Sequence, residues 1–339
     1  MEDEYVLKYK DKGRTGLANI GNTCYINSCL QCLTHTQELN KLLDSPTYKD
    51  RLNDNPDAVI LVEWDNLRNM MWSRNCVVAP HGFVNAIQKN ATTKNQSLFT
   101  GFAQNDMQEF LMFLLESFHK AMSKEIEMKI VGDVKNDKDI IATACYKMMA
   151  SKYEKDYSDI ITLFYGIHVS TITSLEKTEI LSVCAEPFFV LSLSLPDATT
   201  KNTITIYDCF DEFCKKDRLD GDNSWFNEKT YTKQSVDKGI VFWSFPKILI
   251  VHLKRWTYTG SKDRRLVAIP LENMDLSTYV KGYSQPSFIY DLYGVCNHFG
   301  SVSGGHYTAN VKTMDGEWYN FNDEAVTKLS TESVISENA

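Results

Sequence analysis

The feature that most constrains the fold is a change in hydrophobic period near residue 160. Before it, apolar residues recur every three or four positions, as they do on one face of a helix. After it they alternate, as on a strand: "PFFVLSLSLP" sets Phe189 and Leu191 against Val190 and Ser192. The chain is therefore neither all-helical nor all-β. We expect an α+β protein in which a helical N-terminal half precedes an antiparallel β half.

The clearest helical spacing falls in two segments. Residues 23–39 place Ile26, Cys29 and Leu33 on one face, with Asn22 or Thr23 as the N-cap. Residues 106–122 keep the same spacing throughout. A third helix is expected near 59–72, between polar stretches at 41–57 and 90–101 that are typical of loops. Strands are expected at 288–296, 306–313 and 318–321, with a turn at 315–316 joining the last two.

Composition narrows the class of protein. The chain is 43% hydrophobic and 12% aromatic, as in a soluble globular protein. Its 36 Lys and Arg against 44 Asp and Glu give a net charge of −8, which disfavours nucleic acid or an anionic membrane surface as a partner. The sequence lacks a signal-peptide pattern and any apolar run able to span a bilayer. Nine unevenly spread cysteines indicate reduced thiols, so we expect a cytoplasmic location, to which nuclear residence could be added.

The stretch "GLANIGNTCYINSCLQCL", residues 16–33, places Cys24 in the first turn of the first expected helix. There the helix dipole and free backbone N–H groups favour thiolate over thiol. A buried core cysteine is the alternative. An apolar core, however, has no use for Gly21 or for the Asn19 and Asn22 amides, which can donate toward charge beside the sulfur. The pattern predicts a nucleophile.

The same stretch contains a second cysteine pattern, Cys29-x-x-Cys32, for which redox and zinc interpretations are open. A redox pair usually opens a helix, whereas this one lies within it. A zinc site needs further ligands, and the sequence has no second C-x-x-C. We interpret Cys29 as apolar filling of the core.

His306 is the favoured base for the nucleophile. It follows "GSVSGG", small residues that can line a cleft, and begins a strand whose partner ends in Asn322 and Asp323. Either residue could accept a hydrogen bond from the imidazole Nδ1–H. If residues 315–316 were the centre of a regular hairpin, however, Asn322 would lie about 10 Å out of register with His306. A bulge or a displaced loop would have to close that gap.

The alternative for His306 is a solvated loop histidine. Among the other histidines, His298 is close enough to the glycine loop to rim the cleft, and His252 alternates with apolar residues on a strand. Together they form no metal-ligand cluster.

The order Cys, His, Asn/Asp resembles that of papain-like cysteine proteases, and in detail the chain is similar to the ubiquitin-specific protease family of deubiquitinases. The resemblance covers nearly the whole chain, because the matching blocks run from Gly16 to Val326 in the family's order. These blocks are "GLANIGNTCYINSCLQCL", "QNDMQEFLMFLL", "EPFFVLSLSLP", "FPKILIVHLKRW" and "YGVCNHFGSVSGGHYTANVK" through "WYNFNDEAV".

The resemblance implies a role for each matching residue. Cys24 would be the nucleophile, His306 the general base and Asn322 the third member of the triad. Asp323 would support the histidine or the oxyanion region, and Asn19 would supply the oxyanion-hole amide. Asp106 and Glu109 resemble positions near the bound ubiquitin tail. A narrow channel beside Gly304 and Gly305 would suit a substrate that ends in Gly-Gly.

The implied fold is papain-like, with thumb, palm and fingers around one cleft in a single catalytic domain, 1–339. The helical thumb would cover about 1–160, the fingers and part of the palm about 161–245, and the palm with the His box about 246–339. Many family members bind zinc in the fingers through two C-x-x-C pairs. Here the corresponding stretches, "STITSLEKTEI" and "WFNEKTYTKQ", contain no cysteine. We therefore expect no structural zinc and no cofactor.

The implied activity is thiol-dependent hydrolysis at the C-terminal glycine of ubiquitin, through a thioester. Ubiquitin and ubiquitinated proteins would be the partners, and an activating or targeting protein is a further candidate. One alternative is a protease for a ubiquitin-like modifier, whose catalytic blocks would look the same. A general papain-like protease or a thiol acyltransferase such as a transglutaminase would leave "QNDMQEF" unexplained. A ubiquitin-binding protein that does not cut would usually lack the Cys or the His.

Overall fold

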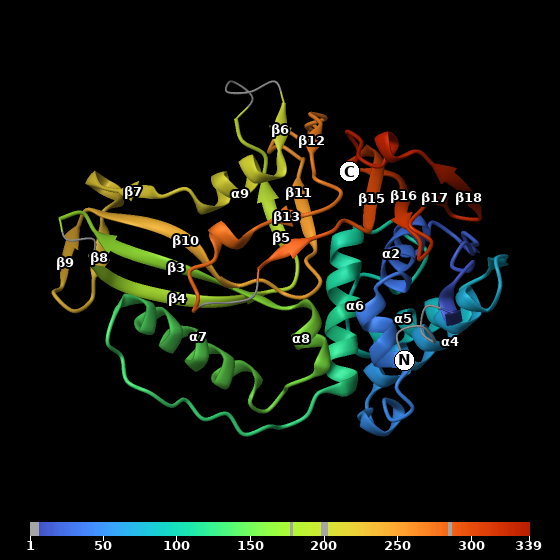
Figure 1. The fold of residues 1–339 in the computed structure, drawn as a ribbon, viewed down its shortest axis with the longest axis horizontal. Coiled ribbons are helices and arrows are strands. Elements are labelled where there is room, and N and C mark those ends of the chain that lie inside the picture. Colours follow the sequence, from blue (N-terminus) through green and yellow to red (C-terminus); the bar gives the residue numbers. More distant parts are fainter. Residues whose placement is uncertain (1–6, 177–178, 198–202, 284–286) are drawn as a thin grey trace.

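The computed structural model describes residues 7–176, 179–197, 203–283 and 287–339. A cluster of helices occupies one end of the molecule, and a long antiparallel sheet extends away from it (Figure 1). A second antiparallel sheet lies over the helix that begins at Cys24. The α+β architecture expected from the change of period is confirmed.

The helical end is built around α2 and α6, which pack against each other. Every residue of α2 except Cys32 is buried, so this helix lies inside the molecule rather than on its surface. Asp106 caps α6, accepting a hydrogen bond from the Glu109 N–H at 3.0 Å. The helices are α2 (Cys24–Thr34), α3 (Gln37–Leu43), α4 (Pro56–Ser73), α5 (His81–Thr93), α6 (Met107–Met122), α7 (Asp137–Tyr153), α8 (Asp159–Phe164) and α9 (Ile206–Cys214), with 3₁₀ turns η1 (Lys49–Arg51), η2 (Gly221–Asn223), η3 (Ser277–Tyr279) and η4 (Thr331–Ser333).

Of the expected helices, those at 106–122 and near 59–72 are confirmed as α6 and α4. The single helix expected over 23–39 is wrong, because the chain breaks after Thr34. Thr36 has an extended backbone, its hydroxyl lies 2.7 Å from the Tyr293 hydroxyl, and Asn40 donates to the Thr34 carbonyl that the break exposes. The stretch 90–101 was expected to be a loop, but α5 runs through its first residues. In the described chain, none of the helices has the length and apolar character to cross a membrane.

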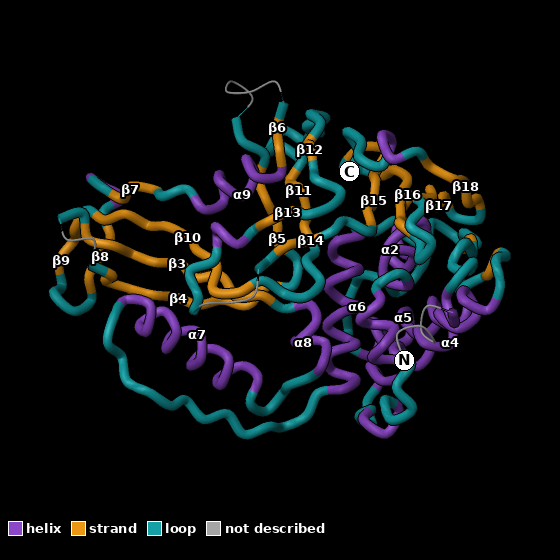
Figure 2. The backbone as a smooth tube through the Cα atoms, in the orientation of Figure 1, coloured by secondary structure: helices purple, strands orange, loops and turns teal. Residues whose placement is uncertain are grey.

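The strands form two larger antiparallel sheets and several short pairs (Figure 2). One sheet has the order β4-β3-β10-β7 and the other β15-β16-β17-β18. The strands are β1 (Gly16–Leu17), β2 (Val77–Val78), β3 (Gly166–Ser174), β4 (Ile180–Phe188), β5 (Leu191–Ser194), β6 (Ile204–Thr205), β7 (Asp217–Leu219), β8 (Trp225–Asn227), β9 (Thr232–Gln234), β10 (Val236–Ser244), β11 (Val251–Lys254), β12 (Val267–Ala268), β13 (Met274–Asp275), β14 (Ile289–Tyr290), β15 (Gly294–Ser301), β16 (Gly304–Lys312), β17 (Trp318–Asn322) and β18 (Ala325–Leu329).

The β half is not antiparallel throughout. β5 pairs with β11 in parallel, and so does β6 with β12. Alternation of apolar residues identifies a half-buried strand but carries no information about its direction relative to a neighbour. The strand expected at 288–296 is also two strands, β14 and β15.

Helix α7 lies along the long sheet rather than among the other helices (Figure 1). Its buried residues Ile141, Ala142 and Cys145 share a small core with Val169 and Trp243 of that sheet. An extended connection leads to it from α6 (Figure 2). The subdomain boundaries near 160 and 245 stay a prediction. Helix α7 precedes residue 160 in sequence, but it packs on the sheet formed by residues after 160.

A buried ionic network fastens the N-terminal segment to the helices. The Arg68 side chain, which is 2% exposed, donates to Asp65 at 2.6 Å and to Asp44 at 2.8 Å. The Tyr9 hydroxyl donates to the other Asp44 oxygen at 2.5 Å. Since a buried charge is tolerated only when it is paired, this network makes Arg68 a structural residue.

Candidate active site

Cys24 is the first residue of α2, as the sequence predicts. The preceding loop turns sharply, with positive φ angles of 126° at Gly21 and 54° at Asn22. Asn19 holds this loop, because its Oδ1 accepts hydrogen bonds from the Gly21 and Thr23 N–H groups at 3.2 and 3.0 Å. Thr23 occupies the N-cap position without using its side chain as a cap. The loop therefore fixes the entry of the chain into the helix and so the place of the thiol.

The surroundings of Cys24 act on the pKa of its thiol in two opposite directions. The residue is 4% exposed, and this burial raises the pKa of its thiol. The backbone N–H of Tyr307 lowers that pKa, while the nearby Asp323 carboxylate raises it. The backbone donors lower this pKa as the sequence predicts, and burial acts on it in the opposite direction.

His306 and Asn322 form a direct pair. The His306 Nε2 lies 2.6 Å from the Asn322 Oδ1. The expected ring atom was Nδ1, so this expectation is corrected: Nε2 faces Asn322, and Nδ1 is left for other contacts. The register explains how they meet. Lys312 lies opposite Trp318 and Ala309 opposite Phe321, which places residue 322 beside residue 308.

The register offset between these residues is smaller than expected, because Asn322 lies two residues rather than three from the position opposite His306. The turn between β16 and β17 spans 313–317, so it is centred on residue 315 rather than between 315 and 316. This shift reverses the side-chain parity, so His306 and Asn322 share a face and become diagonal neighbours, which long side chains can bridge. Neither a bulge nor a displaced loop is needed.

Asp323 contacts the loop before Cys24. It lies in the turn after β17 with a φ of 51°. Its two carboxylate oxygens accept hydrogen bonds from the Asn27 and Asn19 amides, at 2.8 and 2.9 Å. Its backbone carbonyl accepts from the Leu17 N–H at 2.9 Å. Of the two roles considered for Asp323, the geometry favours support of the oxyanion region.

The two amides considered for the oxyanion have partners in the free protein. Asn19 Nδ2 donates to Asp323, and Asn22 Nδ2 donates to the Phe102 carbonyl at 2.9 Å. A side-chain amide carries two N–H groups, so the bond to Asp323 fixes the direction of the second N–H of Asn19. Sequence reasoning missed Asn27, which is buried on α2. The available signal was an amide side chain about one helical turn after Cys24.

A cleft of about 160 Å³ opens beside the thiol. Gly304, Gly305 and Asp106 line it, whereas Glu109 is exposed on the first turn of α6 and is not among its lining residues. His298 lines it, as expected, and burial lowers the pKa of its imidazole. Sequence reasoning missed Gln104, Trp256 and Tyr307, which also line it. Each lies inside a quoted block, but nothing in its residue type distinguishes it from a structural neighbour.

The glycines of this cleft are constrained by close neighbours. A Cβ at Gly304 would collide with Gln104 Oε1, and one at Gly305 would collide with the His298 ring. Gly304 also has a φ of 151°. These contacts bring backbone rather than side chains to the wall of the cleft.

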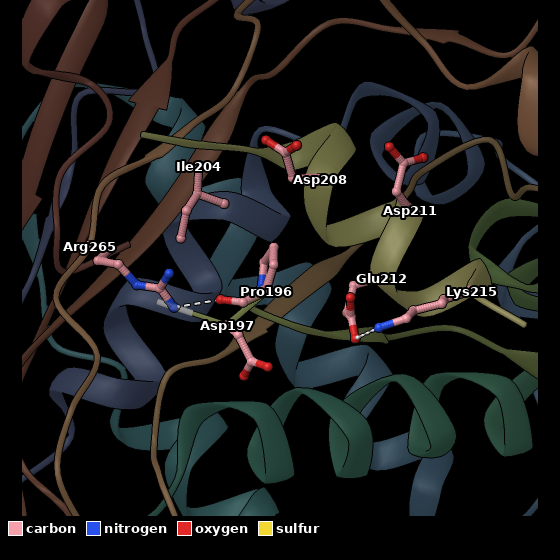
Figure 3. A pocket seen from close by; sticks show the side chains of 8 residues that line it. All are labelled: Pro196, Asp197, Ile204, Asp208, Asp211, Glu212, Lys215 and Arg265. Carbon is pink, nitrogen blue, oxygen red and sulfur yellow. Dashed lines mark hydrogen bonds and ion pairs between the residues drawn. The ribbon is translucent and has the colours of Figure 1, made fainter. Parts of the chain in front are cut away.

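A larger cavity of about 350 Å³ lies elsewhere, between α9 and the ends of β5 and β6 (Figure 3). Arg265 reaches across it to donate to the Pro196 carbonyl at 2.8 Å, and Lys215 pairs with Glu212. None of the site residues predicted from the sequence lines it. Other polar groups of its lining bond to residues outside it, as Asp208 does to Thr205 and Asp211 to Tyr279.

The cysteines and the fingers contain no metal cluster within the described ranges. All nine cysteines are free. Cys29 is part of the main hydrophobic core, as expected, while Cys32 lies 3.6 Å from Cys296 across the interface of α2 and β15. The two stretches without cysteine form the hairpins β3–β4 and β8–β9, of which residues 177–178 lie outside the described chain. The absence of zinc stays a prediction.

The fold and the order of the site residues along the chain are those of the papain-like class. A family model described as "Ubiquitin carboxyl-terminal hydrolase" matches residues 15–339. The chain belongs to this family, which confirms the resemblance found in the sequence.

Individual relatives agree with this assignment. The chain is 33% identical over 337 residues to human ubiquitin carboxyl-terminal hydrolase 2, covering 97% of this chain and 54% of that protein. It is 29% identical over 361 residues to ubiquitin carboxyl-terminal hydrolase 4 of Saccharomyces cerevisiae, covering 96% and 38%. The chain thus spans about half, or less, of the length of these relatives. The solved structure of the SAGA Ubp8/Sgf11/Sus1/Sgf73 DUB module bound to ubiquitin aldehyde has a TM-score of 0.74 at 25% identity, covering 98% of this chain and 69% of that one.

Proposed function

We propose that this chain is a deubiquitinase that hydrolyses isopeptide or peptide bonds at the C-terminal glycine of ubiquitin. The observation that carries the proposal is the His306–Asn322 pair, held on a hairpin beside a cleft that Cys24 lines. Family membership adds the substrate class, because a solved relative is described as bound to ubiquitin aldehyde.

Cys24 acts as the nucleophile and His306 as its base. With the His306 Nε2 bonded to Asn322, Nδ1 is the ring nitrogen that takes the thiol proton. Loss of this proton leaves the thiolate that attacks the substrate carbonyl. The imidazolium then protonates the leaving amine, and a thioester forms. Water, deprotonated by the same imidazole, attacks the thioester and releases ubiquitin and the free thiol.

Negative charge on the carbonyl oxygen is stabilised by backbone N–H groups at the start of α2 and by the second N–H of Asn19. The Asp323 carboxylate orients that amide from the far side. A single side-chain donor of this kind is worth about 3–4 kcal/mol in the transition state.

The cleft supports a substrate that ends in Gly-Gly. Its wall at Gly304 and Gly305 is backbone, against which a tail without side chains can lie. Asp106 in the wall and Glu109 one turn along α6 provide negative charge for a basic tail. Ubiquitin, ubiquitinated proteins and an activating or targeting protein are the proposed partners. Nine free cysteines support a cytoplasmic or nuclear location.

A protease for a ubiquitin-like modifier is the second candidate, since the same catalytic residues would serve it. The test is to mix the purified protein with ubiquitin that carries a thiol-reactive group at its C-terminus and to measure the intact mass. We expect one adduct, absent from Cys24→Ala. An adduct with a ubiquitin-like modifier alone would mean that the protein is specific for that modifier. Cleavage of an unrelated peptide would favour a general protease. No adduct with any of them would contradict the proposal.

A further inference from the structure

The strand that carries His306 has a free hydrogen-bonding edge next to the nucleophile. Successive residues of an antiparallel strand direct their backbone N–H and C=O groups to opposite sides. Within the described chain, β17 pairs with β16 only over Ala309–Lys312. The residues of β16 before Ala309 therefore have β15 on one side and the active-site cleft on the other.

The backbone groups of Tyr307 and Gly305 point toward the cleft. Opposite Tyr307 on β15 lies His298, whose N–H donates to the Asn338 carbonyl at 2.8 Å and whose C=O accepts from Lys262. Because the backbone groups of His298 bond away from β16, the backbone N–H and C=O of Tyr307 point away from β15. Those of Gly305, two residues earlier, point in the same direction. The Tyr307 N–H donates toward the Cys24 sulfur, which locates this edge at the thiol.

The Gly305 part of the edge is occupied by a side chain. Gln104 Oε1 accepts a hydrogen bond from the Gly305 N–H at 3.2 Å, and Gln104 Nε2 donates to the Gly305 carbonyl at 3.4 Å. One amide group thus satisfies both backbone groups of one residue, as a neighbouring strand would. Gln104 is exposed, comes from the segment before α6 and lines the same cleft as Gly305, so its bonds to Gly305 lie within the cleft.

The lengths of the two Gln104–Gly305 hydrogen bonds suit a contact that another donor and acceptor can replace. Both exceed the usual 2.9–3.0 Å of an N–H···O bond, and an exposed pair competes with water. A peptide main chain offers the same donor and acceptor with less side-chain entropy to lose.

We propose that Gln104 is a gate: its amide occupies the free edge at Gly305, and the main chain of the substrate's extended C-terminal segment displaces it on binding. The identity of that segment, a tail ending in Gly-Gly, rests on the proposed function. The gate itself rests only on the contacts of Gln104. It would limit access to the buried thiol until a segment able to pair with Gly305 arrives.

The first arm of the test needs no substrate. Amide hydrogen exchange at 303–307 and the rate of Cys24 alkylation by iodoacetamide are measured in the free wild-type protein and in Gln104→Ala. Loss of the two hydrogen bonds should raise both rates about two- to tenfold. Gln104→Glu, which keeps the size but turns an oxygen toward the Gly305 carbonyl, should behave like Gln104→Ala. Gln96→Ala, an exposed glutamine on the same connection between α5 and α6, should match wild type.

The second arm uses a fluorogenic amide of the ubiquitin C-terminus. Gln104→Ala should lower KM about two- to tenfold and leave kcat unchanged, because a competing group is removed from the free protein. A raised KM or a reduced kcat would make Gln104 a substrate-binding or positioning residue and overturn the gate. Unchanged exchange and alkylation would overturn it as well. If wild type itself ignores ubiquitin, the proposed function fails while the first arm still decides about the gate.

Discussion

His306 and Asn322 are diagonal neighbours on one face of the β16–β17 hairpin, with Nε2 and Oδ1 2.6 Å apart. The pair fixes the imidazole ring through Nε2 and leaves Nδ1 as the nitrogen proposed to take the Cys24 proton. The carbonyl of Asn322 also holds the tautomer in which Nε2 carries the proton. Orientation of the base is therefore built into the hairpin.

Replacing Asn322 should disturb this orientation. We expect Asn322→Ala to lower kcat about 100-fold, within the range for a misplaced general base, while KM stays similar. Asn322→Asp should recover part of the loss, because a carboxylate oxygen can accept the same hydrogen bond from Nε2. Steady-state kinetics across pH test both effects. A kcat within about threefold of wild type for Asn322→Ala would contradict the assigned role.

Asn19 and Asn22 form a matched pair of amides on the same loop. Asn19→Ala should lower kcat about 100- to 1,000-fold with little change in KM, as expected when one oxyanion donor is removed. Asn22→Ala should have a much smaller effect, because the Asn22 amide donates to Phe102. Kinetics on one ubiquitin substrate would compare them. Equal losses in both variants would mean that the loop, rather than the Asn19 amide, matters.

The buried network around Arg68 should dominate the stability of the helical end. Arg68→Ala leaves the Asp44 and Asp65 carboxylates without their buried cation, and we expect a loss of about 3–5 kcal/mol of unfolding free energy. Arg51→Ala is the matched control. Arg51 pairs with Asp159 at 2.5 Å at the surface, where such a pair is worth about 0–1 kcal/mol. Urea unfolding measures both, and similar losses would argue against the network.

Alkaline pH should destabilise the protein through its buried thiols. Burial raises the pKa of Cys145 to about 12 and of Cys209 to about 11, whereas an unfolded thiol titrates near about 8.5. Below that pH both states keep their protons, so stability is fully present. As pH rises toward 11 the unfolded state loses protons first, so the unfolding free energy falls.

Urea unfolding under reducing conditions at pH 7.5 and 10.5 would measure this loss. Cys209→Ala should lose about 2 kcal/mol less than wild type between these values. Cys184→Ala, at an exposed site, should lose as much as wild type. If Cys209→Ala showed the wild-type slope, buried thiols would not be the cause.

The fingers should not need zinc. We expect protein purified from zinc-supplemented medium to contain far less than one equivalent by elemental analysis. A strong chelator should leave its melting temperature unchanged, because the β3–β4 and β8–β9 hairpins contain no cysteine in their described residues. A stoichiometric zinc content, or a lower melting temperature on chelation, would refute this.

Local sequence patterns predicted individual helices and strands better than they predicted how these elements pair and pack. The spacing of apolar residues was enough for α6, and the cap at Asp106 marks its start. The break after Thr34 was not predictable, because it depends on a contact between Thr36 and the distant Tyr293. Parallel pairing of β5 with β11 likewise reflects the order in which distant strands meet.

The residues of the site were predictable, but their environment was not. Motif order singled out Cys24 and His306 as candidates, since reactive groups need certain residue types. The raised pKa of Cys24 comes from burial by the whole fold, and the exact centre of the turn decides whether His306 and Asn322 share a face. Such effects depend on packing and register, which single residues do not encode.

The bond from Asn19 to Asp323 joins residues 304 positions apart in the chain. At about 5–20 residues per second, a ribosome needs about 15–60 s to synthesise the chain between them. During that time the nascent polypeptide already contains its reactive thiol, but not the carboxylate that orients the loop beside it. Because the His306 hairpin also follows the thiol by more than 250 residues, the candidate site cannot be complete until synthesis has passed the Asp323 turn.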